Sequence, residues 1–533
     1  MKQHFKDMDL VKEMTLPLFA VSAYSSLFGA SFGIDHNYWN GVLGMAQFKR
    51  DFGVWDPSTS TYIIPSTWIS AGSGLPSAGL AIGALLSGLF GNRLGRVRTF
   101  LVAAATSIVG IIIQAASLPG HYWQLMAGRI VTTIALGVVC NAVPAYQAEC
   151  APAAIRGALV NAYQCWLLVG ALMANTANWG TYAWESQWAY RLIIVLQLVV
   201  PVVLLVGGAW LPESPRWLVG KEREEEEALE VLLLLRRGTA REAVEEEVRV
   251  LVAAEKEQRQ HLQAASWADC FRGANLRRTL IVAGVQCFQA GQGNSFITNY
   301  GVVFLQAIGV QNTYQTQVLL IFTTTISSVF PFYFADRIGR RLPLIVGAVV
   351  MGVCMYVVAG VTGYAPADDG AALKAATAAL FVWQFFLSSC WSSCVWIVTA
   401  ETPTLHLREK TITIGTFLGF SVGVLVTFVN PFLQDADQAG LGGRVGFVYG
   451  SFSFAAAVWT FLFVPELKGR SLEEIDGLFE AGVKAWGAGR FSGLERGCGT
   501  DIPVLKGVEV GDGRGERSGD EGRESATKGV ESA

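Results

Sequence analysis

The sequence predicts an all-α membrane protein whose twelve transmembrane helices form two six-helix halves, with amphipathic helices on the cytoplasmic side. Three observations predict this fold class. Only 16% of the 533 residues are charged, whereas soluble chains carry about 25%. Apolar stretches long enough to cross the roughly 30 Å of bilayer hydrocarbon recur along the chain. Three charged motifs also occur twice, in the same order and at nearly the same offset.

Apolar stretches set the expected spans, and "LPLIVGAVVMGVCMYVVAGV" is a clear example. A helix of about 20 residues is long enough to cross the bilayer core. In the N-terminal half, residues 17–211, the expected spans are 17–45, 66–91, 99–118, 122–146, 157–179 and 190–211. In the C-terminal half, residues 279–464, they are 279–307, 315–335, 342–363, 374–400, 411–432 and 444–464.

Three polar segments flank or separate the halves. Residues 1–16 form an N-terminal segment, and residues 212–278 form a linker. The linker contains "KEREEEEALEVLLLLRRG", whose spacing is typical of an amphipathic helix. The tail, residues 465–533, begins in the same way and then becomes rich in Gly, Glu, Arg and Ser. This composition predicts disorder after about residue 485.

Basic residues orient the spans. The loops "GNRLGRVR" and "ADRIGRRL" and the linker are rich in Arg, whereas "SLPGH" and "AIGVQNTYQ" contain neither Lys nor Arg. Because positive loops stay on the cytoplasmic side, we expect both termini and the linker in the cytoplasm. The loop at 45–65, with Lys49 and Arg50, is the main exception.

The duplicated motifs carry charge at matching helix ends. "AECAPAAIRGAL" places Glu149 seven residues before Arg156, and "AETPTLHLREKT" repeats the pattern 252 residues later. "GNRLGRVR" returns as "ADRIGRRL", and "LPESPRWL" returns as "VPELKGRSL". Parallel repeats of this kind are typical of transporters whose halves rock around a central site.

We expect these charges to form a cytoplasmic gate, whose carboxylate and guanidinium groups pair when the halves meet and separate when they part. Anchoring of helix ends at the lipid headgroups is the alternative. The expected gating residues are Arg93, Arg96, Glu149, Arg156, Glu213, Arg216, Asp336, Arg337, Arg340, Arg341, Glu401, Arg408 and Glu466.

The motifs "PESPRWL", "DRIGRR", "YQAECAPAAIRGALVNAYQ", "GR" at 128–129 and "PELKGRSLEEID" carry a family resemblance over about residues 17–480. The chain resembles the sugar porter family of the major facilitator superfamily, and its fungal members in particular. The resemblance implies a multi-pass protein of the plasma membrane that transports a sugar by alternating access. The family's usual Asp in the first basic loop is Asn92 here, so we expect a weaker lock in the N-terminal half than around Asp336.

A proton site is expected at Asp35 in the first span. A carboxylate inside the bilayer costs several kcal/mol unless it is functional or paired. Asp occupies this position in proton-coupled members of the resembling family, and Arg129 in the fourth span is its expected partner. Protonation would release Asp35 from Arg129 and bias the conformational equilibrium. A static buried ion pair, or an Asp35 at the watery end of its span, are the alternatives.

The resemblance also implies a set of sugar contacts. Gln164 and Gln289 match ligand-binding Gln residues, and Trp396 matches a ring-stacking Trp. Asn294 and Ser295 lie where the family has polar groups, although Ala290 replaces a second Gln and Gly419 stands where Gln or Asn is common. Hydrogen bonds between helices are the alternative role for these polar residues and for Asn430. These departures allow a hexose, a disaccharide or a related polyol as substrate.

The function expected from the sequence is secondary active transport of a sugar, with proton symport. A transporter-like sugar sensor with little flux and a proton-independent uniporter are the alternatives. The chain lacks a GxxxxGK[ST] nucleotide-binding loop, and nothing in it predicts an enzyme reaction. Its nine cysteines are scattered and contain no CxxC pair, so neither a metal site nor a cofactor is expected. The expected partners are a sugar, protons and lipid, and not nucleic acid.

Overall fold

The computed structural model describes residues 14–57, 60–152, 155–221, 225–264, 266–331, 337–364, 370–434, 438–470 and 472–487. Most of these residues are helical. The tail after residue 487, for which we expected disorder, lies outside the described residues.

Helices corresponding to all twelve expected spans are present. In the N-terminal half they are α3 (Leu16–Gly44), α5 (Ser66–Leu94), α6 (Arg96–Ala115), α7 (Tyr122–Cys150), α8 (Arg156–Thr181) and the pair α9 (Trp188–Leu196) and α10 (Val199–Gly207). In the C-terminal half they are α14 (Gly273–Gln289) with α15 (Ser295–Ala307), α16 (Thr313–Ser327), α18 (Arg341–Tyr364), α19 (Gly370–Phe386) with α20 (Ser393–Glu401), α21 (Arg408–Gln434) and α22 (Val445–Phe463). Nine helical segments in the described part of the chain are long and apolar enough to cross a membrane.

Two spans of the C-terminal half contain a π-helical turn that the apolar pattern did not predict. The segment η3 (Ala290–Asn294) joins α14 to α15, and η4 (Leu387–Ser392) joins α19 to α20. Gly293 in η3 has φ 99°, a conformation that a residue with a Cβ rarely adopts. Single π turns inside helices are frequent at functional sites.

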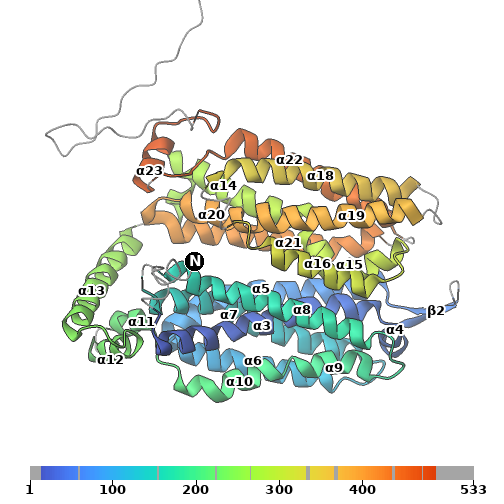
Figure 1. The fold of residues 1–533 in the computed structure, drawn as a ribbon, viewed down its shortest axis with the longest axis horizontal. Helices are drawn as coiled ribbons and strands as arrows, with labels where there is room; N and C mark the ends of the chain where they lie inside the picture. The colour runs from blue at the N-terminus through green and yellow to red at the C-terminus, as the bar shows by residue number, and fades with distance from the viewer. Residues whose placement is uncertain are drawn as a thin grey trace, which may run out of the picture.

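The two halves lie side by side (Figure 1), and one buried apolar cluster includes residues of both. α3 packs against α8, and α7 packs against both α5 and α6. In the other half α18 packs against α19 and α22, and α14 packs against α21. In the described part of the chain, the main contacts between the halves are those of α5 with α21, α3 with α15, and α8 with α16.

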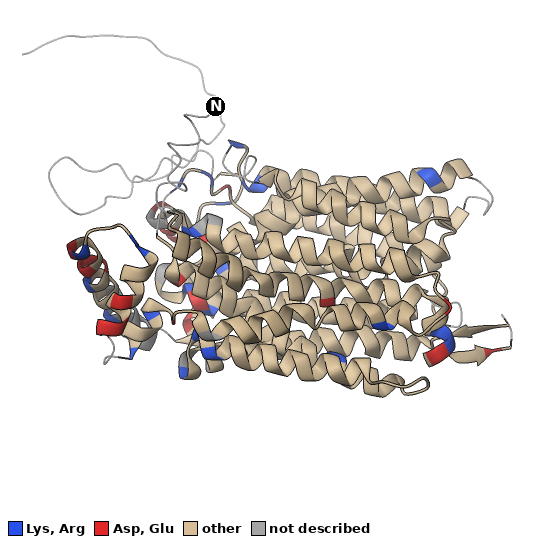
Figure 2. Cartoon of the chain, turned by 60° about the horizontal axis from the view of Figure 1, so that its bottom comes forward, with Lys and Arg blue, Asp and Glu red and all other residues tan. Residues whose placement is uncertain are grey.

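The two ends of the bundle differ. The linker helices α11 (Pro215–Gly220), α12 (Glu225–Leu235) and α13 (Arg241–Ala264) and the tail helix α23 (Leu472–Glu480) lie at one end, here called the linker end. At the opposite end, here called the hairpin end, lie α4 (Ala46–Phe52) and the antiparallel strands β1 (Val54–Asp56) and β2 (Thr61–Ile63). Most of the chain positions coloured as Lys, Arg, Asp or Glu lie at the linker end (Figure 2).

Short 3-10 segments complete the connections: η1 (Gly208–Trp210), η2 (Trp267–Phe271), η5 (Leu405–Leu407) and η6 (Gly442–Arg444). The linker helices pack on apolar faces, as their amphipathic pattern predicts. α12 buries Ala228, Leu232 and Leu235, and α13 buries Val244 and Val248. Arg236 ties this linker to the N-terminal half, because its guanidinium donates to the Cys150 carbonyl and pairs with Glu247.

Candidate functional site

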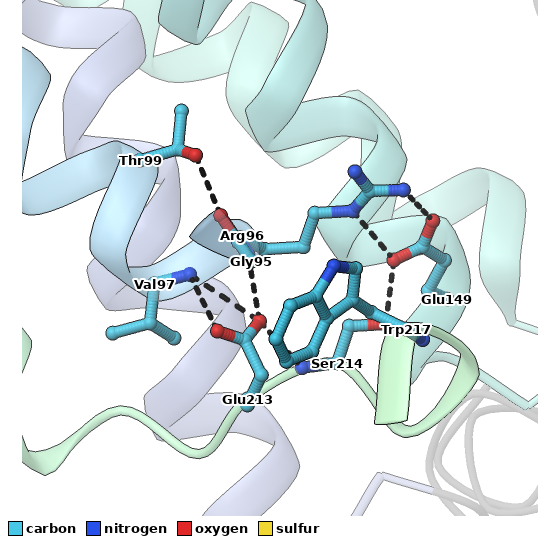
Figure 3. Close-up of polar contacts among 8 residues, drawn as sticks. All are labelled: Gly95, Arg96, Val97, Thr99, Glu149, Glu213, Ser214 and Trp217. Carbon is cyan, nitrogen blue, oxygen red and sulfur yellow. Dashed lines mark hydrogen bonds and ion pairs between the residues drawn. The ribbon is translucent and has the colours of Figure 1, made fainter. Parts of the chain in front are cut away.

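At the linker end of the N-terminal half, one arginine and two glutamates form a compact cluster (Figure 3). The Arg96 guanidinium donates to both carboxylate oxygens of Glu149, at 3.1 and 2.8 Å. The Ser214 hydroxyl donates to Glu149 Oε2 at 2.5 Å. A bidentate pair with an added hydroxyl is among the stronger polar arrangements in proteins.

The second glutamate of this cluster, Glu213, caps a helix. Its carboxylate accepts hydrogen bonds from the backbone N–H groups of Arg96 and Val97, the first residues of α6 (Figure 3). An anion is favoured there because the first N–H groups of a helix lack partners and carry the positive end of the helix dipole. Burial nevertheless raises the pKa of the Glu213 carboxyl above its usual range, against the opposing effect of these hydrogen bonds.

The C-terminal half repeats this architecture. The Glu466 carboxylate accepts from the backbone N–H groups of Arg340 and Arg341, at the start of α18. The Arg340 guanidinium donates to Glu401 Oε1 at 3.0 Å. Gly95 and Gly339, the residues before the two capped helix starts, have φ of 94° and 104°. A Cβ on either would lie within 2.5 Å of the capping glutamate.

The ion pairs of the two Glu-containing motifs lie within their own halves. Glu149 pairs with Arg96 in the N-terminal half, and Glu401 pairs with Arg340 in the C-terminal half. Among the other expected gating residues, Arg93 and Arg156 are exposed and Arg341 donates to the Phe461 carbonyl at 2.7 Å. Arg216, Arg337 and Arg408 are described, but Asp336 and the side chain of Asn92 are not. The expected difference between the Asn92 and Asp336 loops therefore stays a prediction.

Contacts between the halves are extensive at the hairpin end. Asn40 Oδ1 accepts a hydrogen bond from the Val302 backbone N–H at 2.7 Å. The Tyr314 hydroxyl donates to the Gly41 carbonyl at 3.0 Å, and its ring stacks on Tyr182 with centroids 4.5 Å apart. Residues of α3 and α8 thus bind residues of α15 and α16, so the hairpin end is closed in this conformation.

Asp35 and Arg129 lie in one small cavity near this closed end. Each is 3% exposed, and the cavity has a volume of about 20 Å³. The Arg129 guanidinium donates to the Gly72 carbonyl and lies 4.1 Å from the centre of the Trp39 ring. Among the described residues, Asp35 Oδ1 has no hydrogen-bond partner and no ion pair joins it to Arg129. The expected pair is therefore not formed in this conformation, although Arg129 Nε also has no hydrogen-bond partner among the described residues.

The expected sugar contacts flank the π turns. Gln289 ends α14, Asn294 ends η3 and Ser295 begins α15, and all three are half-buried. Trp396 on α20 is 46% exposed, and Gln164 on α8 is also exposed. α14 packs against α20, which places the helices of Gln289 and Trp396 side by side. Their roles in sugar binding stay predictions.

Asn430 and Gly419, two further positions considered for sugar binding, have a role in helix packing. Asn430 is buried, and its Oδ1 accepts a hydrogen bond from the Tyr449 hydroxyl at 2.9 Å, which is the alternative role considered for it. A Cβ added at Gly419 would lie 2.9 Å from Gln286 Cβ. Gly419 therefore allows α21 to approach α14 closely, and no side chain from this position can reach a ligand without moving that helix.

Sequence reasoning missed several buried polar residues. Gln286 donates to Thr399 at 3.1 Å, and Asn299 on α15 lines the Asp35 cavity. The side chain of Gln292, in η3, is fully buried, and its amide atoms have no partner among the described residues. A polar residue in an apolar stretch was the available signal, but it does not reveal which side of the helix is buried.

A larger cleft of about 550 Å³ opens at the hairpin end, above the closed contacts. It is lined by helix ends and loops, including Arg50, Trp184, Glu185 and Gln311. None of the expected sugar contacts lines it. This cleft is therefore separate from the residues expected to bind sugar.

Comparison with known proteins decides the family. The family described as "Sugar (and other) transporter" matches residues 21–479, nearly the whole described chain. The protein is a sugar porter of the major facilitator superfamily. The sugar porter is 32% identical to the "Probable glucose transporter rco-3" of Neurospora crassa, over 91% of this chain and 82% of that protein. This confirms the resemblance that its motifs indicated.

Two further similarities concern this sugar porter's relatives and fold. It is 29% identical to the "High glucose sensor RGT2" of Saccharomyces cerevisiae, over 86% of this chain but 60% of the sensor. Its fold matches the inward-open conformation of the xylose transporter XylE from E. coli with a TM-score of 0.71 and 20% identity. That match covers 86% of this chain and 99% of XylE, and it confirms the twelve-helix fold.

Proposed function

We propose that this sugar porter moves a hexose or related polyol across the plasma membrane by alternating access, in symport with protons. The linker end, where the basic loops gather, faces the cytoplasm, and the hairpin end faces outward. The conformation described here is closed at the outer face. Membership of the family and the similarity to a probable glucose transporter support the sugar as cargo.

The observation that carries proton coupling is the burial of Asp35. A carboxyl group that is 3% exposed, within a membrane helix and without an ion pair, is costly in its charged form. A proton removes that cost. Arg129, in the same cavity, favours the charged form by Coulomb attraction, and more strongly once its guanidinium is released from Gly72 and Trp39 to pair with Asp35. Asp35 can therefore exchange a proton as the conformation changes.

Sugar uptake with simultaneous pH recording tests this function. A panel of labelled sugars is offered to cells that lack their own sugar transporters. Sugar-dependent alkalinisation of the medium is expected, and Asp35→Asn should abolish uphill accumulation while exchange of labelled for unlabelled sugar continues. Full concentrative uptake by Asp35→Asn would contradict the coupling assignment. Flux that ignores a proton uncoupler would indicate a uniporter.

A sensor is the second candidate, favoured by the similarity to the high glucose sensor. In that case the protein binds sugar without appreciable flux. The same assay distinguishes a transporter from a sensor, because a sensor binds sugar but shows neither uptake nor alkalinisation. Trp396→Ala and Gln289→Ala should weaken sugar affinity in either case, with unchanged amounts of protein in the membrane.

A further inference from the structure

The Asp35 cavity is shared by the two halves. Its N-terminal-half lining comes from α3, α5 and α7 and includes Asp35, His36, Ser77 and Arg129. Its only lining residue from the other half, within the described part of the chain, is Asn299 on α15. Asn299 is 5% exposed. Because α15 packs against α3 at the closed hairpin end, Asn299 completes this cavity only while that end is closed.

The orientation of the Asn299 amide is fixed by a hydrogen bond. Its Nδ2 donates to the Ser295 carbonyl at 2.9 Å, one turn earlier in α15. This leaves Oδ1, which can only accept hydrogen bonds, for other contacts. Among the described residues, Asp35 Oδ1 is a buried oxygen with no hydrogen-bond partner, and Asp35 lines the same cavity. About 20 Å³ accommodates about one water molecule, so these groups are poorly screened from each other.

We propose that Asn299 senses the proton on Asp35 and so couples protonation to closure of the hairpin end. This inference rests on the proposed symport. A protonated Asp35 can donate a hydrogen bond to the Asn299 amide oxygen, directly or through one water. An ionised Asp35 presents only acceptors to the same oxygen, so closure around the charged form places two acceptors in one small cavity.

The other groups near Asp35 do not provide this link. Arg129 on α7, and His36 and Tyr38 on α3, are the titratable or charged neighbours. All three belong to the N-terminal half and move with Asp35. The lining residues from α5 and α15 are uncharged. Tyr300 on α15 is a titratable residue of the other half that lies near Arg129, and its hydroxyl donates to the Thr427 carbonyl at 2.7 Å. Asn299 is the described residue of the other half that lines the cavity itself, so its position can make the proton affinity of Asp35 depend on the relative position of the halves.

Linkage gives the consequence for transport. If closure favours the protonated form, then protonation favours closure by the same factor. The carrier with an ionised Asp35 stays open at the hairpin end, which prevents it from carrying sugar inward without a proton. Loss of the Asn299 acceptor should remove this selection and allow uncoupled sugar flux.

The test uses the full-length protein in proteoliposomes, with spin labels on Ala183 and Gln311, exposed positions on opposite halves at the hairpin end. The pH at which half of the molecules are closed is measured together with the proton-to-sugar ratio. Asn299→Leu should lower the midpoint by about one pH unit, a tenfold loss of proton affinity from one hydrogen bond. The proton-to-sugar ratio should fall while sugar exchange stays within about twofold of wild type.

Three controls make the outcome decisive. Asn299→Ser keeps an acceptor oxygen and should retain a midpoint close to wild type. Ser77→Ala removes a hydroxyl from the same cavity on the N-terminal side and should not shift it. An Asn299→Leu protein that folds, exchanges sugar and keeps the wild-type midpoint and ratio would overturn the proposal. Absence of sugar-driven proton movement in the wild-type protein would instead overturn the proposed symport.

Discussion

Each half contains a charged corner, defined as the arginine and two glutamates at the start of α6 or α18, and the two corners differ in their hydrogen bonds. In both, a glutamate carboxylate caps the helix that begins after a glycine of positive φ, and an arginine from that helix start pairs with a second glutamate. Glu149 in the N-terminal half accepts hydrogen bonds from two guanidinium nitrogens of Arg96 and from the Ser214 hydroxyl. Glu401 in the other half has one described bond from Arg340, and its Oε2 has no hydrogen-bond partner among the described residues.

This difference shows that the helix cap is common to both halves, whereas the ion pair differs between them. The cap is a backbone interaction that starts a transmembrane helix, so both halves need it. The ion pair is made by side chains and can be weak on one side. Leu467 follows Glu466 where Ser214 follows Glu213, so the C-terminal half lacks the hydroxyl that completes the pair. Glu401 is therefore the better placed of the two to change partners when the halves approach.

Replacing the glycine that precedes each capped helix should have the largest effect on stability, and the effect should be equal in the two halves. Gly95→Ala or Gly339→Ala places a Cβ within 2.5 Å of Glu213 or Glu466, in a backbone conformation that costs about 1–3 kcal/mol outside glycine. We expect a severe loss of folded protein, measured by size-exclusion chromatography after heating. A wild-type melting profile for either variant would show that the corner is not a structural element.

Neutralising the paired glutamates should distinguish the halves. Glu149→Gln leaves Arg96 partly buried without its bidentate partner and should cost about 2–3 kcal/mol, whereas Glu401→Gln should cost about 1 kcal/mol. In a Ser214→Ala background the cost of Glu149→Gln should fall toward that of Glu401→Gln. Equal costs in the wild-type background, measured by thermal unfolding in detergent, would contradict the proposed asymmetry.

The smallest effect is expected at Glu213, and it should depend on pH. Because burial raises the pKa of this carboxyl, its contribution to stability is greatest below the ordinary Glu value and is lost as pH rises through the raised pKa. Glu213→Gln keeps an acceptor for one N–H and avoids the charge, so its cost should be at most about 1 kcal/mol near neutral pH.

The control for this pH experiment is Glu245→Gln, at a partly exposed site on α13. Its stability should follow the wild-type pH curve, while the Glu213→Gln curve should be flatter in mildly acidic solution. Parallel curves for all three proteins would show that Glu213 does not titrate differently in the folded and unfolded states.

Much of the fold could be predicted from the sequence. Apolar length located the spans because each helix must satisfy its own backbone hydrogen bonds in lipid. The first expected span, 17–45, corresponds to α3 at Leu16–Gly44. The π turn at η4 could not be predicted, since it depends on tertiary packing: Trp391 is fully buried and donates to the Leu344 carbonyl at 2.9 Å. The loop at 45–65 also contains α4 and a short hairpin that no periodicity indicated.

The candidate site was less accessible to sequence reasoning. The charged corners were found because they are repeated, but the partner of each charge was not, since Glu149 pairs with Arg96 of its own half and not across the halves in this conformation. Asp35 was found because a carboxylate in an apolar stretch is costly. Asn299 was missed because an amide in a membrane helix is tolerated in many settings. Its role depends on which residue of the other half lies opposite.

The central claim is that the halves move against each other, so that one end opens as the other closes. The distance between spin labels on Ala183 and Gln311 reports the hairpin end, and labels on Arg98 and Thr413, also exposed and on opposite halves, report the linker end. Both pairs are measured in a cysteine-depleted protein that retains transport, with and without sugar and at two pH values. Distances that change in opposite directions are predicted. Two distances that rise and fall together, or that never change during active transport, would contradict alternating access by these halves.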